Sequence, residues 1–407
     1  MRLRLMLHVF LVVPISFPLC ASTIHVPADQ PTIQAAINAA NPGDVVMVAP
    51  GTYSENINFL GKAITVRSSG GAGVTVIDGG RIAPVATFNS GETTKSILGG
   101  FTLQNGTSTF DSQYDGGGVY VSGASPTITN NTIQNNTACS SGGGIALSFS
   151  SAVVQNNVIK SNSQSGCSGG PGGGGIAVVG AGSAVITGNQ IQRNTWGSNG
   201  GGITLFAAGT PILRNNIITQ NSSSGGQGGG IWIVNESNAL IVQNLFAFNT
   251  GSQGGAIYLL VPSGDPGPVL VNNTIIGGAG ATQGSAVWAG GFDNQVLFYN
   301  NLLIGLTRQN AVYCDATYNS APPIFTNNDA FSMNGSGLLG TCASQASQNG
   351  NISDNPMFVS STSAQLKAGS PAINAGDNSA PDIPAKDLAN KTRIVGGTID
   401  MGAYEFQ

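Results

Sequence analysis

A two-part repeat of about 28 residues runs through the middle of the chain and limits its fold more than any other feature. One part is a cluster of small residues followed by alternating apolar residues, and its seven copies have their last small residue at 118, 144, 175, 202, 230, 256 and 286. The other part has the form Asn-x-Ile-x-x-Asn, with copies starting at Asn131, Asn157, Asn189, Asn216 and Asn244 and looser copies at Asn273 and Asn301. Seven copies in phase indicate an architecture in which each unit stacks on the next.

Each unit is too short to bury an apolar face by itself. Its short runs of alternating Ile, Val and Leu predict strands of a few residues, and the Gly clusters and Asn predict corners with positive φ. A single-stranded, right-handed parallel β-helix satisfies this pattern, because every turn lays its strands on those of the turn before at about 4.8 Å. The predicted fold class is therefore an all-β solenoid.

Composition agrees with stacked corners. The chain has 60 Gly and 39 Asn among 407 residues, but only 14 Lys and Arg and 18 Asp and Glu. Aligned Asn side chains can hydrogen-bond along a stack, whereas a charge repeated on every turn would lie beside its like. The 41% apolar content argues against disorder, the Gly residues lack the collagen period, and the net charge of −4 argues against nucleic-acid binding.

The two ends differ from the repeats. Residues 1–21 have the charged start, apolar run and small-residue end of a secretory signal peptide, with a lipid anchor on Cys20 as the alternative. Residues 22–95 are expected to form an N-terminal cap and first coils, with a helix over 31–40, strands at 45–48, 64–66 and 74–77, and a turn at 49–53. The repeats occupy 96–310, and 311–407 are expected to form C-terminal coils that fold over the far end.

Four cysteines remain in the mature chain. Cys139 and Cys167 are separated by 28 residues, as are Cys314 and Cys342, so each pair falls on neighbouring turns. In an exported protein these pairs predict two disulfides, and buried free thiols are the alternative.

Motifs at both ends carry a family resemblance. Residues 31–37 and 43–55 resemble the start of pectin-lyase-like right-handed β-helix proteins, and the repeats resemble the parallel β-helix repeats of that superfamily. The segments 369–376, 387–393 and 400–405 resemble the "choice-of-anchor Q" C-terminal region of bacterial secreted β-helix proteins. The resemblance implies the fold; it leaves activity open, because the superfamily includes lyases, hydrolases, esterases, epimerases and non-enzymes.

Charged residues on the central coils are few. Glu236 is the one carboxylate between residues 120 and 260, so the carboxylate pair that glycoside hydrolysis needs is missing there. Lys160, Arg193 and Arg214 are the candidate catalytic residues for β-elimination, as a basic patch that holds a uronate; the alternative is three solubilising charges. Asp111 and Asp115 flank the first Gly-rich corner, either as a site at one end or as turn residues.

An aromatic strip is the most specific candidate for binding. The middle position of the Gly-rich unit should point outward, and on three consecutive turns it holds Trp232, Tyr258 and Trp288. Sugar rings stack on aromatic faces, so we interpret these residues as a glycan-binding strip. The alternative is a satellite core beneath a loop such as residues 262–268.

Two functions remain open from the sequence. One is a secreted protein that binds extracellular or cell-surface polysaccharide without catalysis; the other is a polysaccharide lyase or related carbohydrate-active enzyme. We expect a monomer that is secreted, extracellular, at the cell surface or periplasmic, with no nucleic-acid partner and no transmembrane segment. No cofactor or metal is expected; calcium, common in lyases of this superfamily, is the alternative, although no Asp and Glu cluster is visible on the coils.

Overall fold

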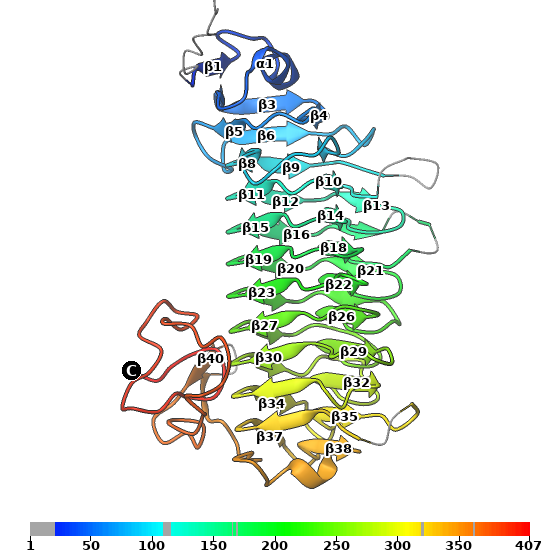
Figure 1. Cartoon of the computed structure of the whole chain (residues 1–407), viewed down its shortest axis with the longest axis vertical. Helices are drawn as coiled ribbons and strands as arrows, with labels where there is room; N and C mark the ends of the chain where they lie inside the picture. The colour runs from blue at the N-terminus through cyan, green and yellow to red at the C-terminus, as the bar shows by residue number, and fades with distance from the viewer. Residues whose placement is uncertain (1–20, 109–114, 165, 168–169, 319–320, 361–362) are drawn as a thin grey trace, which may run out of the picture.

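The computed structural model describes residues 21–108, 115–164, 166–167, 170–318, 321–360 and 363–407. The predicted signal peptide lies outside these residues, apart from Ala21. Short strands stack into three long parallel sheets, and the chain visits each sheet once per turn of a tall solenoid (Figure 1). The β-helix predicted from the repeat is confirmed.

We name the sheets A to D. Sheet A contains β1 (Thr23–Val26), β2 (Val45–Val48), β5 (Thr65–Ser68), β8 (Ile97–Gly99), β11 (Thr127–Thr129), β15 (Val153–Gln155), β19 (Val185–Thr187), β23 (Ile212–Arg214), β27 (Leu240–Val242), β30 (Val269–Val271), β33 (Leu297–Tyr299) and β36 (Ile324–Thr326). Sheet B contains β3 (Gly51–Ser54), β6 (Thr75–Asp78), β9 (Thr102–Gln104), β12 (Thr132–Gln134), β16 (Val158–Lys160), β20 (Gln190–Gln192), β24 (Ile217–Thr219), β28 (Leu245–Ala247), β31 (Thr274–Ile276), β34 (Leu302–Gly305) and β37 (Asp329–Ser332).

Sheet C carries the Gly-rich units. It contains β4 (Ile57–Asn58), β7 (Ala86–Phe88), β10 (Val119–Ser122), β14 (Ile145–Ser148), β18 (Ile176–Val179), β22 (Ile203–Phe206), β26 (Ile231–Val234), β29 (Ile257–Val261), β32 (Val287–Gly291), β35 (Val312–Cys314) and β38 (Leu338–Gly340). The small sheet D contains β13 (Thr137–Ala138), β17 (Ser163–Gln164), β21 (Thr195–Trp196) and β25 (Ser222–Ser223), and it lies between sheets B and C along the chain.

The Gly-rich corner before each sheet C strand is tightly packed. A Cβ atom on Gly144 would lie 2.5 Å from the carbonyl oxygen of Gly175 on the next turn. Only glycine allows successive turns to approach this closely. The alternating apolar residues that follow point inward and form one continuous core along the solenoid.

Two ladders of buried Asn connect the turns. The first lies at the corner between sheets A and B, where each backbone N–H donates to the side-chain oxygen of the next Asn at 2.9–3.0 Å, through Asn131, Asn157, Asn189, Asn216, Asn244, Asn273, Asn301, Asn328 and Asn351. The second follows sheet B through Asn136, Asn162, Asn194, Asn221 and Asn249 at 3.0–3.1 Å. The predicted stacking of Asn is confirmed.

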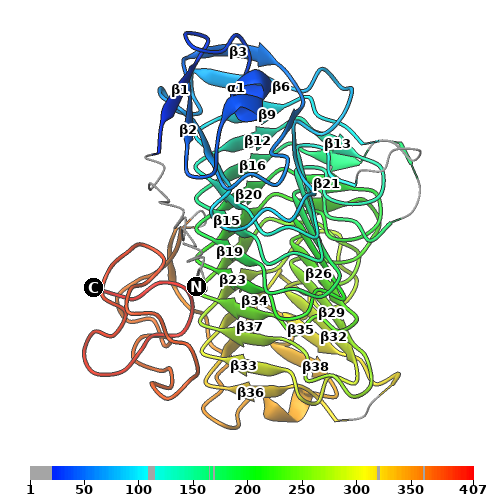
Figure 2. The same cartoon turned by 45° about the horizontal axis from the view of Figure 1, so that its top comes forward.

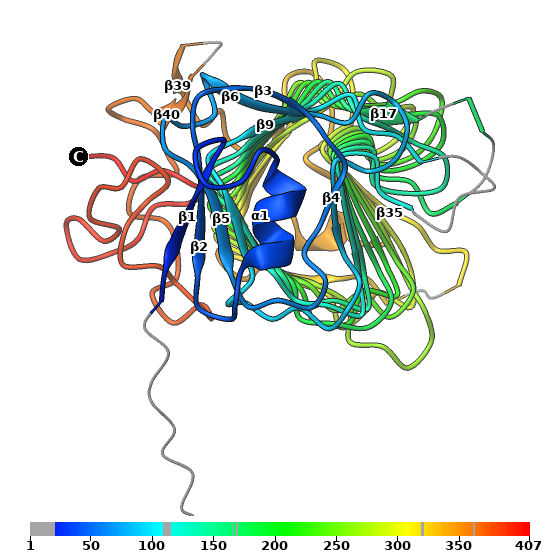
Figure 3. The ribbon, with the colours of Figure 1, turned by 90° about the horizontal axis from the view of Figure 1, so that it is seen from above.

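A short helix covers the N-terminal end of the core, as predicted. Helix α1 (Ile33–Ala39) lies across the opening of the solenoid (Figure 3) and buries Ile33, Ala36 and Ile37. Glu55 accepts the backbone N–H groups of Ile33 and Gln34 at 2.9 Å, and Lys62 Nζ donates to three carbonyl oxygens at the other end of the helix. Two of the few charges of the chain thus satisfy the helix termini.

The expected turn at 49–53 is wrong in part. The structure has strand β3 there, in register with β6, because the neighbouring turn offers a parallel partner to this segment. Such a partner overrides the local turn signal of Pro50-Gly51.

The far end is closed by a short segment. The 3-10 helix η1 (Ala343–Gln345) follows β38, and the side chain of Gln345 bonds to backbone groups of Pro323 and Phe325. Both predicted disulfides are present, with Cα–Cα distances of 5.2 Å for Cys139–Cys167 and 5.7 Å for Cys314–Cys342.

The expectation that the rest of the C-terminal region folds over the far end is wrong. The region lies beside the solenoid (Figures 1 and 2). It includes the antiparallel pair β39 (Phe358–Ser360) and β40 (Ser363–Leu366). Its Ala380 and Ile383 pack on the outward Val242 and Val271 of sheet A. Side-chain amides at one corner of the solenoid donate to backbone oxygens of the C-terminal region. Asn272 Nδ2 donates to Asp400 O at 3.1 Å, and Asn300 Nδ2 donates to Asp377 O at 3.0 Å.

Carboxylates hold the loops of this region together. Asp387, Asp400 and Glu405 each accept two backbone N–H groups at 2.6–3.1 Å. Arg393 is buried near them, and burial lowers its pKa to about 10. These charged residues of the C-terminal motifs therefore have structural partners.

Candidate functional site

The predicted aromatic strip lies in register on the outer face of sheet C. Trp232 is paired with Tyr258, Tyr258 with Trp288, and Trp288 continues to Tyr313 on β35. A second outward column runs beside it through Phe206, Val234 and Leu260. Strand alternation places both columns outside the core, as the repeat pattern indicates.

The rings pack against neighbouring rings and are largely shielded from solvent. Tyr258 and Trp288 have centroids 4.5 Å apart and planes within 4°, and Phe206 and Trp232 are stacked at 6.2 Å. Parallel strands repeat at about the Tyr258–Trp288 distance, so rings in register on successive turns can stack face to face. Trp232 is half-buried, and Tyr258 and Trp288 are only 5% and 6% exposed. The strip is therefore a packed cluster, which agrees with the satellite-core alternative, and its binding role stays a prediction.

The cluster has polar partners at its N-terminal side. Trp232 Nε1 donates to Gln227 Oε1 at 3.3 Å, and Gln227 Nε2 donates to Gln253 Oε1 at 2.8 Å. Burial raises the pKa of Tyr258 to about 12. These contacts hold Trp232 and Gln227 in place, and burial leaves little of Tyr258 for a ligand.

A pocket that the sequence did not indicate lies at the corner after sheet C. Its volume is about 140 Å³, and its lining includes Asn235, Leu260, Pro262, Gly291, Phe292 and Tyr318. The rings of Phe292 and Tyr318 are 6.3 Å apart, and they are 37% and 59% exposed. Leu260 belongs to both the pocket and the aromatic cluster, so the pocket continues the outer face of sheet C.

Four carboxylates occupy this same corner on successive turns: Glu236, Asp265, Asp293 and Asp315 follow β26, β29, β32 and β35. Asp265 Oδ1 accepts from Asn238 Nδ2 at 2.7 Å. Asp293 is fully buried, and within the described chain neither of its oxygens has a hydrogen-bond partner. Burial, together with the negative charge of Asp315, raises the pKa of Asp293 to about 7. The corner is thus acidic.

The three candidate cations do not share one sheet. Lys160 lies on β16 of sheet B, in register with Gln134 and Gln192. Arg193 follows β20 of the same sheet, and its Nε donates to Gln220 Oε1 at 2.9 Å. Arg214 lies on sheet A, between Thr187 and Val242. The structure places none of them among the residues that line the pocket.

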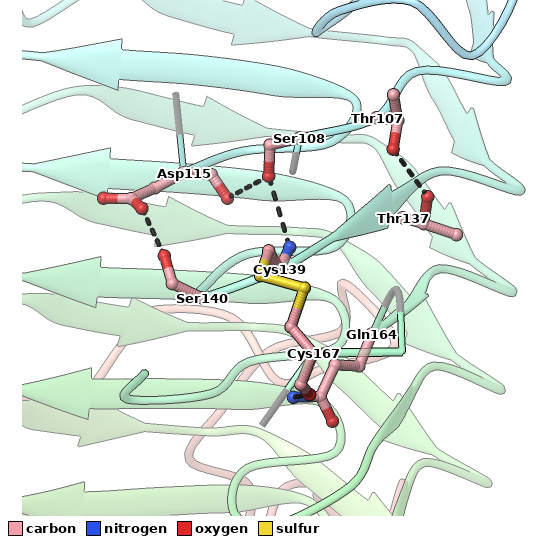
Figure 4. The surroundings of a disulfide bond; sticks show 8 residues. All are labelled: Thr107, Ser108, Asp115, Thr137, Cys139, Ser140, Gln164 and Cys167. Carbon is pink, nitrogen blue, oxygen red and sulfur yellow. Dashed lines mark hydrogen bonds between the residues drawn. A yellow bond between two sulfur atoms is a disulfide. The ribbon is translucent and has the colours of Figure 1, made fainter. Parts of the chain in front are cut away.

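The first Gly-rich corner is held by local contacts (Figure 4). Asp115 accepts a hydrogen bond from Ser140 Oγ, and its backbone oxygen accepts from Ser108 Oγ at 3.2 Å beside the Cys139–Cys167 disulfide. This agrees with the turn interpretation of Asp115, and Asp111 lies outside the described residues. Within the described ranges, no group of three His, Cys, Asp or Glu could hold a metal ion.

Comparisons with known proteins concern the fold. Residues 117–303 match the profile of a family described as "Right handed beta helix region". The solved structure of pectate lyase Pel9A is similar, with a TM-score of 0.53 and 18% identity, over 95% of this chain and 96% of that one. The fold is a right-handed β-helix. The chain also resembles the structure of XylC with xylose, at a TM-score of 0.48 and 11% identity, over 73% of this chain and 72% of the other.

No curated protein matches the sequence. At 18% identity the pectate lyase shares the architecture, and its activity does not transfer by likeness alone. None of the described helices has the length and apolar character needed to span a bilayer.

Proposed function

We propose that this protein binds polysaccharide outside the cell through the outer face of sheet C, where the pocket adjoins the aromatic cluster. The pocket itself is the observation that supports the proposal. Two part-exposed rings, Phe292 and Tyr318, line it together with the apolar side chain of Leu260. Apolar C–H faces of sugar rings pack on such aromatic side chains, and the rigid scaffold keeps the site preformed.

An extracellular location is part of the proposal. Two disulfides link neighbouring turns, and disulfides of this kind persist in oxidising compartments. The signal-like sequence of residues 1–21 supports export. The resemblance of residues 369–405 to a choice-of-anchor-Q region agrees with a secreted protein.

The placement of charges favours binding over lyase activity. β-Elimination of a uronate needs a base and a group that neutralises the substrate carboxylate. Lys160 and Arg193 lie at sheet B and Arg214 on sheet A, whereas the corner beside the pocket carries acids. A uronate held in the pocket would therefore lie away from the candidate bases.

The test is affinity electrophoresis of the purified protein against a panel of soluble polysaccharides. For a retained polysaccharide, the double variant Phe292→Ala, Tyr318→Ala should bind at least about tenfold more weakly, which corresponds to about 1.4 kcal/mol. Phe248→Ala is the matched control, because Phe248 is an exposed ring that follows β28 of sheet B. Unchanged binding by the double variant, or equal loss in the control, would contradict the proposal.

A second measurement addresses the lyase alternative. The protein is incubated with uronate polysaccharides, with and without calcium, and the absorbance of the unsaturated product is followed. We expect no absorbance change. A signal that is lost in Lys160→Ala or Arg193→Ala would replace binding by β-elimination as the function.

A further inference from the structure

The pocket beside the aromatic cluster is too small for a whole oligosaccharide. Its volume of about 140 Å³ lies below the 300–1,000 Å³ of pockets that enclose a drug-sized ligand. A chain of sugars lying on the outer face of sheet C could therefore insert one substituent here and leave its backbone outside. The pocket would then discriminate among glycans by the chemical nature of that substituent.

The lining of the pocket is apolar. Leu260, Val261, Pro262 and the ring of Phe292 provide carbon surface, and the backbone of Gly291 forms part of the wall. Asn235 and Tyr318 bring the side-chain polar groups to the lining. A hydroxyl or charged group buried against such a surface loses hydrogen bonds to water that the lining replaces poorly.

The charge around the pocket excludes acidic sugars. The sequence has no Lys or Arg at 215–307 or 309–366, and the single cation between these ranges, Arg308, follows β34 of sheet B. The corner residues Asp265, Asp293 and Asp315 belong to the turns that build the pocket, and Asp265 lies near Asn235 and Leu260 of the pocket lining. A sugar carboxylate would meet the like charge of Asp265 and Asp315 without a neutralising partner.

We propose that this pocket receives the methyl group of a sugar substituent, as found in 6-deoxyhexoses and acetylated sugars, and so selects a neutral, methyl-bearing glycan. This inference rests on the proposed binding function. Burying one methyl group contributes about 0.8 kcal/mol, which corresponds to about a fourfold change in dissociation constant. A 6-hydroxymethyl group in the same place would leave its hydroxyl without a full set of partners, so the discrimination should reach four- to tenfold.

The experiment measures competition by monosaccharides against a polysaccharide that the wild-type protein retains. Fucose, rhamnose and N-acetylglucosamine should compete at concentrations four- to tenfold lower than galactose, glucose, glucosamine or galacturonate. The arms distinguish the two sources of the methyl group, since fucose and rhamnose are 6-deoxy and N-acetylglucosamine is acetylated. Equal competition by glucose, or stronger competition by glucosamine or galacturonate, would overturn the inference.

A substitution in the pocket provides an independent readout. Leu260→Asn places an amide in the apolar floor, and we expect it to reduce the preference for methyl-bearing sugars to less than twofold. Leu297→Asn is the matched control, a half-buried outward Leu on sheet A. Circular dichroism and the thermal midpoint report whether each variant is folded, and the wild-type competition decides the inference even if Leu260→Asn does not fold.

The outcomes separate this inference from the proposed function. Retention of polysaccharide that depends on Phe292 and Tyr318, but shows no methyl preference, would contradict the inference and leave binding intact. Failure of the wild-type protein to retain any glycan would contradict both.

Discussion

At the scale of single residues, a few buried carboxyls stand out in a chain with so few charges. Asp329 begins β37, and its Oδ1 accepts from the backbone N–H of Asp354 at 3.1 Å, while its Oδ2 has no partner in the described part of the chain. Burial raises the pKa of Asp329 to about 8, and the charge of Asp354 acts in the same direction. The folded protein therefore holds a proton that the unfolded chain releases near pH 4.

This shift predicts a stability that falls with rising pH. The raised pKa contributes stability that is fully present below about pH 4 and is lost as the pH rises through about 8. Asp329→Asn cannot ionise, so its thermal midpoint should decline less between pH 5 and pH 9 and exceed that of the wild type at pH 9. Asp293 and Glu405, whose pKa values are raised to about 7, should leave part of the decline in place.

Thermal unfolding at pH 5, 7 and 9 checks this prediction. Asp382→Asn, which changes an exposed carboxyl of the C-terminal region, is the control and should follow the wild type. Parallel declines for Asp329→Asn and the wild type would show that Asp329 is ionised in the folded protein.

At the scale of elements, the corner between sheets A and B depends on one side chain per turn. Asn216 joins β23 to β24; its Oδ1 accepts from the backbone N–H and Nδ2 of Asn189 at 3.0 Å, and its Nδ2 donates to Ile186 O and to Asn244 Oδ1. All these groups are out of contact with water. A ladder of this kind stabilises the corner only while each step is filled.

Asn216→Ala should therefore lower the free energy of unfolding by about 3 kcal/mol or more, because each buried polar group left without a partner costs about 1–3 kcal/mol. Urea unfolding followed by circular dichroism measures the loss. Gln190→Ala, an exposed amide one residue after a ladder Asn, should change the midpoint little. A loss of similar size in both variants would argue against the ladder as the source of stability.

At the scale of the whole molecule, the C-terminal region is docked beside the solenoid where one outward column of sheet A changes from polar to apolar residues. The column reads Thr187 and Arg214 on two successive turns and Val242 and Val271 on the next two. The apolar residues lie where Ala380 and Ile383 cover them. The burial of apolar surface on these turns therefore stabilises the docked position.

Val271→Asp should undock this region without unfolding the solenoid, since a carboxylate beneath Ala380 would be buried without a partner. Limited proteolysis should then cleave within residues 353–407 at least about tenfold faster, while the β-sheet signal in circular dichroism stays unchanged. Thr187→Asp is the control, because Thr187 holds the equivalent position on a turn outside the apolar cluster of Val242, Val271 and Ala380. Equal cleavage rates for the two variants would contradict docking through this column.

How far the sequence predicts each feature depends on whether the feature repeats. The Asn ladders, the strand register of Trp232, Tyr258 and Trp288, and both disulfides follow from spacing, because stacked turns bring residues about 28 apart to neighbouring positions. The orientation of the rings does not follow from spacing. Register placed them outside the core, but Tyr258 and Trp288 stack on each other and Trp232 stacks on Phe206, which removes ring surface from solvent.

The pocket could not be predicted, because it is built from corners that differ in length from turn to turn. Leu260, Phe292 and Tyr318 come from three turns, and nothing in their spacing marks them as neighbours. The sequence did contain one signal for the acidic corner: Asp265 and Asp293 each follow a Gly-rich unit, and Asp315 follows the apolar segment of the next turn. Aligning these acids by turn would have placed them on one edge.

The excess of Gly and Asn in a two-part repeat was enough by itself to determine the β-helix and the stacking of its turns, because those depend on local geometry applied many times. The helical segment 31–40 separately predicted the N-terminal cap. Only the tertiary structure decided where a ligand can be received and where the C-terminal region lies. Both depend on contacts between irregular segments, whose path is set by the surface they cover and not by the repeat.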